Sequence, residues 1–176
     1  MVAVVVIISA TVSASVLGIG ATLDEPAPNV AETTGAFEPG ASEQEVLVTH
    51  VAGDNVRVEN IEIVVRASGP GVDTEARLVN LPAGTSDIDD VNIDGDDSII
   101  SEGFGDAGPS DPNQVIIEDF PADNNIWEAG ETIQFEINVG GADFREPPSS
   151  PDADTLEVVV VHPPSGSTIS EHTFTP

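Results

Sequence analysis

The sequence predicts an α+β protein in which a long N-terminal apolar α-helix is followed by an antiparallel immunoglobulin-like β-sandwich. The first 23 of the 176 residues carry no charged side chain, although the whole chain has a formal net charge of −28. Beyond residue 44, apolar and polar side chains alternate in short stretches separated by turn residues, as in half-buried strands. We therefore expect an N-terminal helix over 1–23, an acidic Pro/Gly linker over 24–44 and a sandwich domain over 45–176.

The uncharged N-terminal run is long enough to form a membrane-spanning helix. At about 1.5 Å per residue its 23 residues would extend about 34 Å, against a bilayer core of about 30 Å. Asp24, Pro26 and Pro28 follow it and would end a helix. A helix that is apolar all round must bury every face.

Three interpretations of this run compete. A cleaved secretory signal is disfavoured because the run has no positively charged start. A lone membrane anchor satisfies the length and hydropathy. A helix that packs against copies of itself also explains why Ala10, Ala14 and Gly18 recur every four residues, since small side chains at that spacing let helix backbones approach closely.

The remaining sequence predicts six to eight short strands. The clearest alternation places Ile133, Phe135, Ile137 and Val139 on one face of a strand. Strands are also expected at 61–65, 75–81, 114–119, 156–162 and 167–174. The last two flank "PPSG", which predicts a C-terminal hairpin. Many short strands with turn-rich connections are typical of an antiparallel sandwich.

The charge of the chain excludes some classes of partner and indicates the salt concentration to which the protein is adapted. The 32 acidic residues face four arginines and no lysine, so the chain cannot neutralise a nucleic-acid backbone. At about 1 M salt the Debye length is only about 3 Å, which screens the repulsion between these acids. The composition therefore indicates a protein adapted to very high salt. Cysteine is absent, which excludes disulfides and thiolate chemistry.

No enzyme is predicted, and neither is a cofactor. One stretch, "DVNIDGDD", places Asp90, Asn92 and Asp94 in the order of the first half of a calcium loop. The twelfth position, where a bidentate acid belongs, is Ser101, so we expect no metal and keep calcium as a minor alternative. The three histidines, at positions 50, 162 and 172, have no metal-binding spacing, and we expect structural roles for them.

Four motifs in order resemble the archaeal type IV pilins of halophiles. These are the apolar run ending in "SVLGIG", the stretch "VTHVAGDNVRVENIEIVV" from Val48, "WEAGETIQFEI" from Trp127, and "VVVVHPPSGSTISEHTF" from Val158. The resemblance implies a subunit that is held in the membrane by its N-terminal helix, trimmed by a prepilin peptidase, and assembled by an ATPase and its platform into a helical filament of many copies.

The resemblance also implies an extracellular, cell-surface location and a role in surface or cell adhesion. In such a filament the helices form the core, and the residues expected there include Val5, Ile8, Ala10, Ala14, Leu17 and Gly18. Two alternatives remain: a subunit of the archaeal swimming filament, the archaellum, and a monomeric membrane-anchored surface protein that binds calcium.

Overall fold

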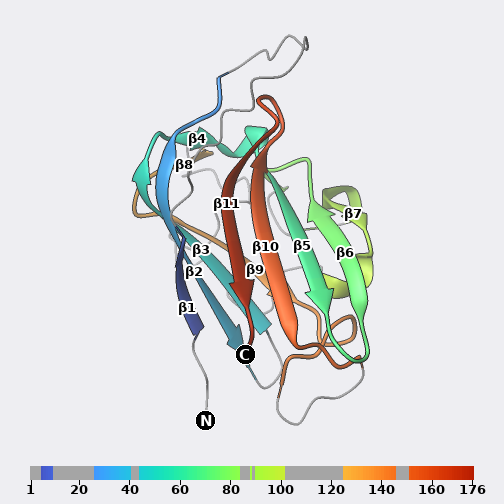
Figure 1. The fold of residues 1–176 in the computed structure, drawn as a ribbon. Coiled ribbons are helices and arrows are strands. Elements are labelled where there is room, and N and C mark those ends of the chain that lie inside the picture. Colours follow the sequence, from blue (N-terminus) through green and yellow to red (C-terminus); the bar gives the residue numbers. More distant parts are fainter. Residues whose placement is uncertain are drawn as a thin grey trace, which may run out of the picture.

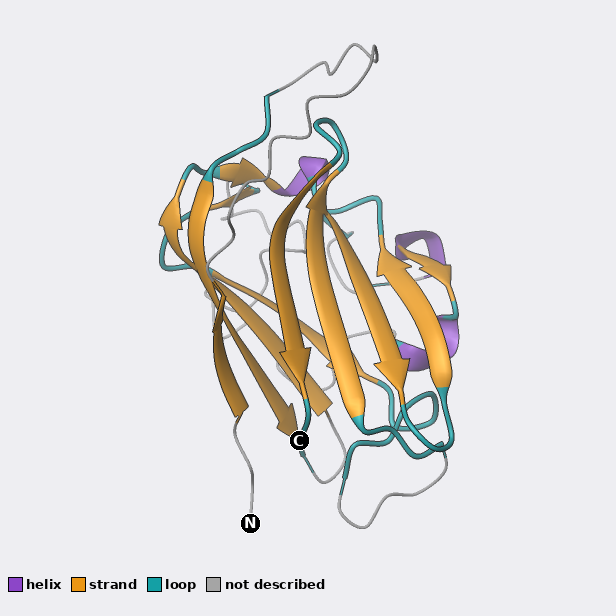
Figure 2. Ribbon diagram, viewed as in Figure 1, coloured by secondary structure: helices purple, strands orange, loops and turns teal. Residues whose placement is uncertain are grey.

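The computed structural model describes residues 5–9, 26–40, 44–83, 88, 90–101, 125–145 and 151–176. These residues form eleven strands and three short 3-10 turns, arranged as two main sheets and one two-stranded ribbon (Figures 1 and 2). The 3-10 turns are η1 (Val58–Asn60), η2 (Asp90–Asn92) and η3 (Asp97–Ile99). No helix in the described part of the chain is long and apolar enough to cross a membrane.

The first sheet has the order β1-β2-β3-β9, and all its neighbouring strands are antiparallel. Its strands are β1 (Val5–Ser9), β2 (Val30–Pro39), β3 (Gln44–Gly53) and β9 (Thr132–Ile137). A short ribbon of β4 (Val56–Arg57) and β8 (Ile126–Trp127) lies at one end of the molecule (Figure 1).

The second sheet has the order β11-β10-β5-β6-β7 and is also antiparallel. Its strands are β5 (Glu62–Ser68), β6 (Asp73–Leu78), β7 (Ile93–Gly95), β10 (Thr155–His162) and β11 (Ser167–Phe174). The chain passes from the first sheet to the second between β3 and β5, returns to the first between β7 and β9, and passes to the second again between β9 and β10. The sheet orders β2-β3-β9 and β11-β10-β5-β6-β7 follow the A-B-E and G-F-C-C′-C″ orders of an immunoglobulin-type sandwich.

A single hydrophobic core fills the space between the two sheets. Alternate residues of the central strands are fully buried, as the period of a half-buried strand requires. The inward residues predicted for the strands at 61–65 and 132–139 are among them, namely Ile61, Ile63, Val65, Ile133, Phe135 and Ile137, except Val139, which lies beyond the end of β9 and is only partly buried. The predicted C-terminal hairpin is present as β10 and β11, whereas the strand predicted at 114–119 lies outside the described residues.

The prediction of a long N-terminal helix is wrong. Val5–Ser9 forms strand β1, which pairs antiparallel with β2, and the described residues contain 3-10 turns but no α-helix. Two physical factors explain the error. A continuous apolar run has no period that separates a buried helix from a buried strand. Valine and isoleucine favour strands because their branched side chains restrict helical rotamers, and β2 provides a backbone edge to pair with.

Part of the predicted linker is also a strand. The range 24–44 was expected to be irregular because of its prolines, glycines and acids, but Val30–Pro39 forms β2. Its buried positions include Thr33 and Gly35, whose small or polar side chains hid the alternation that normally marks a strand.

Candidate functional site at the N-terminal edge of the sandwich

Within the N-terminal apolar run, Val5–Ser9 is described as β1, which is the outermost strand at one edge of the first sheet. β1 pairs with β2 over five positions, from Val5 opposite Phe37 to Ser9 opposite Thr33. β11, the outermost strand of the second sheet, contacts both β1 and β2 (Figure 1). Of the residues predicted for a filament core, Val5 and Ile8 lie in β1, and Ala10, Ala14, Leu17 and Gly18 lie outside the described residues.

A glycine allows β2 and β11 to approach each other closely. A Cβ atom added to Gly35 would lie 2.6 Å from Cγ of His172 and 2.9 Å from Cζ of Phe174. Both distances are far below van der Waals contact, so any larger side chain would push the two strands apart. Gly35 therefore fixes the separation of the two sheets at this edge.

A buried polar network joins the same two strands. The Oγ1 of Thr33 lies 2.8 Å from Oγ of Ser170 and 3.1 Å from Nε2 of His172, and the Ser170 Oγ to His172 Nε2 distance is 2.9 Å. All three residues are at most 1% exposed. Burial lowers the pKa of His172 to about 4, so its imidazole is neutral at pH 7.

Ser170 and His172 pair a hydroxyl with an imidazole, as a nucleophile and its base would, but both side chains are inaccessible to a substrate. No substrate can reach a hydroxyl that is 0% exposed between two sheets. The three side chains satisfy one another's hydrogen bonds inside the core, as buried polar groups must. Their role is to fix β11 to β2.

A second cluster brings together two of the motifs noted in the sequence. The ring of His50 on β3 lies 5.1 Å from that of Trp127 on β8, and Nδ1 of His50 lies 3.3 Å from the Trp127 carbonyl oxygen. The Trp127 indole nitrogen donates to the carbonyl oxygen of Glu131, which also accepts from the backbone N–H of His50. Nε2 of His50 is buried with no hydrogen-bond partner among the described residues. The stretches beginning at Val48 and Trp127 thus form one folded unit.

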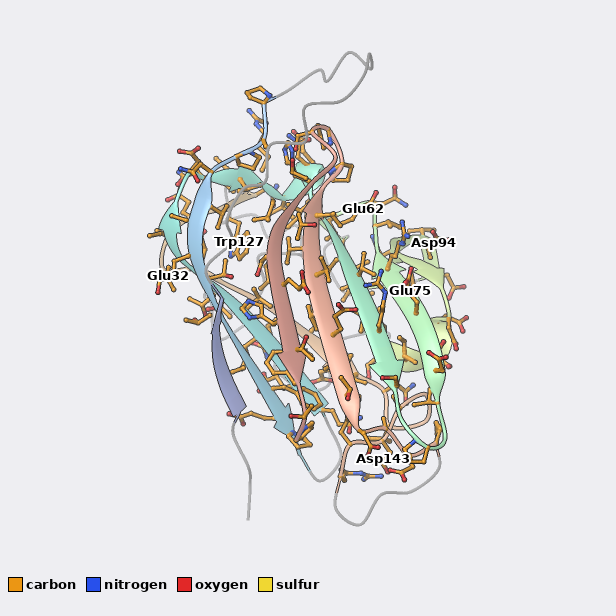
Figure 3. All side chains as sticks on the ribbon, in the orientation of Figure 1. Glu32, Glu62, Glu75, Asp94, Trp127 and Asp143 are labelled. Atoms are coloured by element: carbon orange, nitrogen blue, oxygen red, sulfur yellow. The ribbon has the colours of Figure 1, made fainter. Side chains whose placement is uncertain are left out.

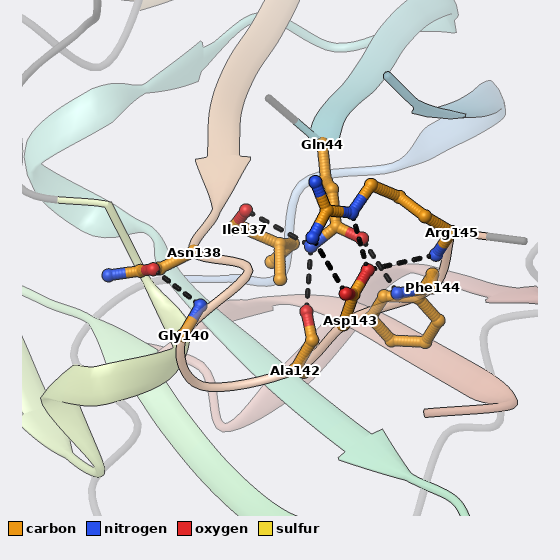
Figure 4. Close-up of polar contacts among 8 residues, drawn as sticks. All are labelled: Gln44, Ile137, Asn138, Gly140, Ala142, Asp143, Phe144 and Arg145. Carbon is orange, nitrogen blue, oxygen red and sulfur yellow. Dashed lines mark hydrogen bonds and ion pairs between the residues drawn. The ribbon is translucent and has the colours of Figure 1, made fainter. Parts of the chain in front are cut away.

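A third cluster secures the loop that follows β9 (Figure 4). The side-chain amide of Gln44 donates to the carbonyl oxygens of Ile137 and Ala142, and its oxygen accepts from the backbone N–H of Phe144. Arg145 binds the fully buried carboxylate of Asp143 through Nε and Nη2, at 2.7 and 2.8 Å. These bonds satisfy the buried polar groups of the loop and tie it to the start of β3.

The outer face of the second sheet carries an ion network. Arg66 binds Glu75 at 2.6 Å and Glu157 at 2.7 Å, and Arg77 approaches Glu75 at 3.4 Å. The Arg66 guanidinium lowers the pKa of Glu75. Acidic side chains also point outward elsewhere, as Figure 3 shows for Glu32 and Asp94. Open hollows of about 480 and 420 Å³ beside Arg66 are lined by these ions, threonine and valine, without a nucleophile paired to a base.

In the candidate calcium loop, the Asn92 side chain has other partners. Asp90 and Asn92 lie in η2, and Asp94 lies in β7. The Asn92 side chain is buried and donates to the carbonyl oxygens of Val79 and Asn80. Within the described residues, no group of three or more histidine, aspartate or glutamate side chains is placed to hold a metal ion.

No sequence pattern predicted the Thr33–Ser170–His172 network. Thr33 lay in the predicted linker, and 137 residues separate it from Ser170. The packing of β11 against β2 brings these positions together. Comparison of the chain with protein-family models, with curated proteins and with solved structures gave no match to any of them.

Proposed function

We propose that this chain is the structural subunit of an extracellular, type IV pilus-like filament from a halophilic archaeon, assembled through its charge-free N-terminal segment. The observation that carries the proposal is the position of this segment. Its strand β1 is the outermost strand of the first sheet in a strongly acidic chain, and this edge position supports assembly through the segment.

Burial of the apolar segment supplies the driving force for assembly. Removing apolar surface from water contributes about 25 cal/mol per Å². All 32 acidic residues follow the 23 uncharged ones, and lipid before assembly or other copies after it would provide an apolar partner for the uncharged run. The acidic sandwich then faces concentrated salt, where its charges are screened.

The cellular role and the assembly partners follow from the sequence resemblance. A pilus-like filament would serve adhesion to surfaces or to other cells. Its subunits would meet a prepilin peptidase, an assembly ATPase and the platform in the membrane. The helical core that the resemblance implies is not carried over, because Val5–Ser9 forms a strand.

The test is to find the chain in filaments. Cells are sheared in high salt, the released material is pelleted, and the pellet is viewed by electron microscopy and analysed for this chain with residues 1–20 intact. We expect thin filaments that contain it. If the chain is found only in the membrane fraction, the filament proposal is overturned and the anchored surface protein is favoured. In a separate experiment, loss of swimming after deletion of the gene would favour the archaellum.

A matched pair of variants tests the charge-free segment. Ala14→Asp should abolish filaments, because an uncompensated charge is costly in lipid and in an apolar assembly. Ala14→Val should leave filaments intact. Normal filaments from Ala14→Asp would contradict assembly through this segment.

A further inference from the structure

We propose that Gly53 and Asp54 form a latch that fixes the joint at which the chain enters the sandwich, and that regular assembly of the subunits depends on this latch. The joint consists of Asn29, the last residue before β2, and Val30, the first residue within it. The inference rests on the proposed function, because the joint follows the charge-free N-terminal run that we propose for assembly. Gly53 and Asp54 act as positioning residues.

Asp54 holds Asn29 by both of its backbone polar groups. The Asn29 N–H donates to Oδ2 of Asp54 at 3.0 Å, and the Asp54 N–H donates to the Asn29 carbonyl oxygen at 3.0 Å. The first of these bonds ends on a carboxylate, and hydrogen bonds to charged groups are stronger than neutral ones. Because the two bonds hold the peptide groups on both sides of the Asn29 Cα atom, they fix the position of this residue and the direction of the chain through it.

Gly53 lets β3 approach the joint more closely than any other residue would allow. It is the register partner of Val30, which is 4% exposed. A Cβ atom added to Gly53 would lie 2.5 Å from the Asn29 carbonyl oxygen and 2.7 Å from Cα of Val30, far below van der Waals contact. The φ angle of Gly53 is +133°, which L side chains rarely adopt. The close contact and the backbone conformation therefore both require glycine at this position.

The joint depends on the latch because the regular ladder of β2 begins only beyond it. The pairing of β2 with β3 shifts register between Val30 and Glu32 and again between Glu32 and Thr33. From Thr33 to Pro39 the two strands then pair at every position. A register shift interrupts the ladder and bends the strand locally. The regular ladder therefore does not by itself fix Asn29 and Val30, and the latch supplies this hold.

The prolines that precede the joint extend its direction along the chain. Pro26 and Pro28 lie within the four residues before Val30. Proline fixes its own φ near −65° and restricts the residue before it to extended conformations. Because such a segment bends little, its direction is set where Asn29 is held. Identical copies make the same contacts in a regular assembly only if each presents this segment at the same angle.

Variants of Asp54 test the latch in the full-length chain. Asp54→Ala removes the carboxylate that binds Asn29, whereas Asp54→Asn keeps a side-chain oxygen that can accept the same bond. Asp94→Ala is the charge control, because it removes an acid from an exposed position on β7. Amide hydrogen exchange is measured on the full chain in detergent and high salt, and filaments sheared from cells are viewed by electron microscopy.

We expect Asp54→Ala to speed exchange of the Asn29 N–H about tenfold or more, as loss of a hydrogen bond to a charged group implies. The same variant should lose filaments with a regular helical repeat. Asp54→Asn and Asp94→Ala should behave like the native chain in both measurements.

Two glycine variants separate contact with the joint from backbone strain. Gly130 has a φ angle of +99°, but no atom beyond its chain neighbours lies within 4 Å of a Cβ added there. Gly53→Ala should therefore disrupt regular filaments, whereas Gly130→Ala should leave them intact. Equal loss from both variants would overturn the role of the close contact at Gly53.

The outcomes also separate this inference from the proposed function. Regular filaments from Asp54→Ala, together with fast exchange at Asn29, would overturn the latch as a requirement for assembly and leave the filament standing. Unchanged exchange at Asn29 would show that Asp54 does not hold the joint, and would overturn the latch even if filaments are lost. If the native chain itself forms no filaments, the proposed function fails and the role of the latch in assembly fails with it.

Discussion

The two strands that meet at one edge of the sandwich, β1 and β11, are held in different ways. β11 is joined to β10 by a four-residue turn, pairs with it at seven positions, and buries Ile169 and Phe174. β1 pairs with β2 at five positions across a connection of twenty residues. A strand with a short connection and deeply buried side chains belongs to the cooperative core, whereas one with a long connection opens at lower free energy. We therefore expect β1 to open more easily than β11 at the same edge.

Removing the aromatic anchor of β11 should have the largest effect. Phe174 is fully buried, and its ring centroid lies 5.8 Å from that of Phe37 on β2. We expect Phe174→Ala to lower the free energy of unfolding by about 3–5 kcal/mol, measured by denaturant titration in high salt. The exposed neighbour Thr173 provides the control, because Thr173→Ala should change the free energy of unfolding by less than about 0.5 kcal/mol. Equal effects of the two variants would mean that β11 is not anchored through its side chain.

Acid should weaken β11 through His172. Burial lowers its folded-state pKa from 6.5 to about 4, so the unfolded chain takes up the proton first as the pH falls. Its contribution to stability is complete above pH 6.5 and is lost between pH 6.5 and pH 4, by about 3 kcal/mol in total. We expect the stability advantage of the native chain over His172→Gln to shrink by that amount between pH 7.5 and pH 4. The carboxylates titrate in both proteins, so parallel curves would contradict the prediction.

Adding a side chain at the point where β2 and β11 approach closely should have an intermediate effect on the free energy of unfolding. Gly35→Ala places a methyl group against the rings of His172 and Phe174, and we expect a loss of about 1–3 kcal/mol in unfolding free energy. Ala36→Ser, at the neighbouring position on the opposite face of β2, should be close to neutral. If the two substitutions cost the same, Gly35 does not set the separation of the sheets.

The contrast between these strands also marks what the sequence could predict. β11 follows a clear turn, "PPSG", and its hairpin with β10 was predicted correctly. β1 lies in a continuous apolar run that has no period, so length alone favoured a helix. β2 was missed because Thr33 and Gly35 occupy buried positions where large apolar residues normally mark a strand. In both cases the deciding information was the partner strand, which local sequence does not contain.

The edge site itself was only half predictable. Lack of charge predicts that the N-terminal segment contacts an apolar partner, and this prediction follows from composition alone. The Thr33–Ser170–His172 network joins residues far apart in the chain, and its function depends on burial that only the packed sheets create. Gln44 is a comparable case, since one side chain satisfies three backbone groups of the loop after β9.

The smallest effect on stability should come from breaking β1. Ile7 is opposite Gly35, and Ile7→Pro removes a backbone donor and restricts the backbone of the strand. Because β1 has fewer register partners than β11 and a longer connection, the free energy of unfolding should fall by about 1 kcal/mol or less. Hydrogen exchange should show the β1 amides opening well before those of β11. A loss of several kcal/mol, or protection of β1 equal to that of β11, would make β1 an integral strand of the cooperative core.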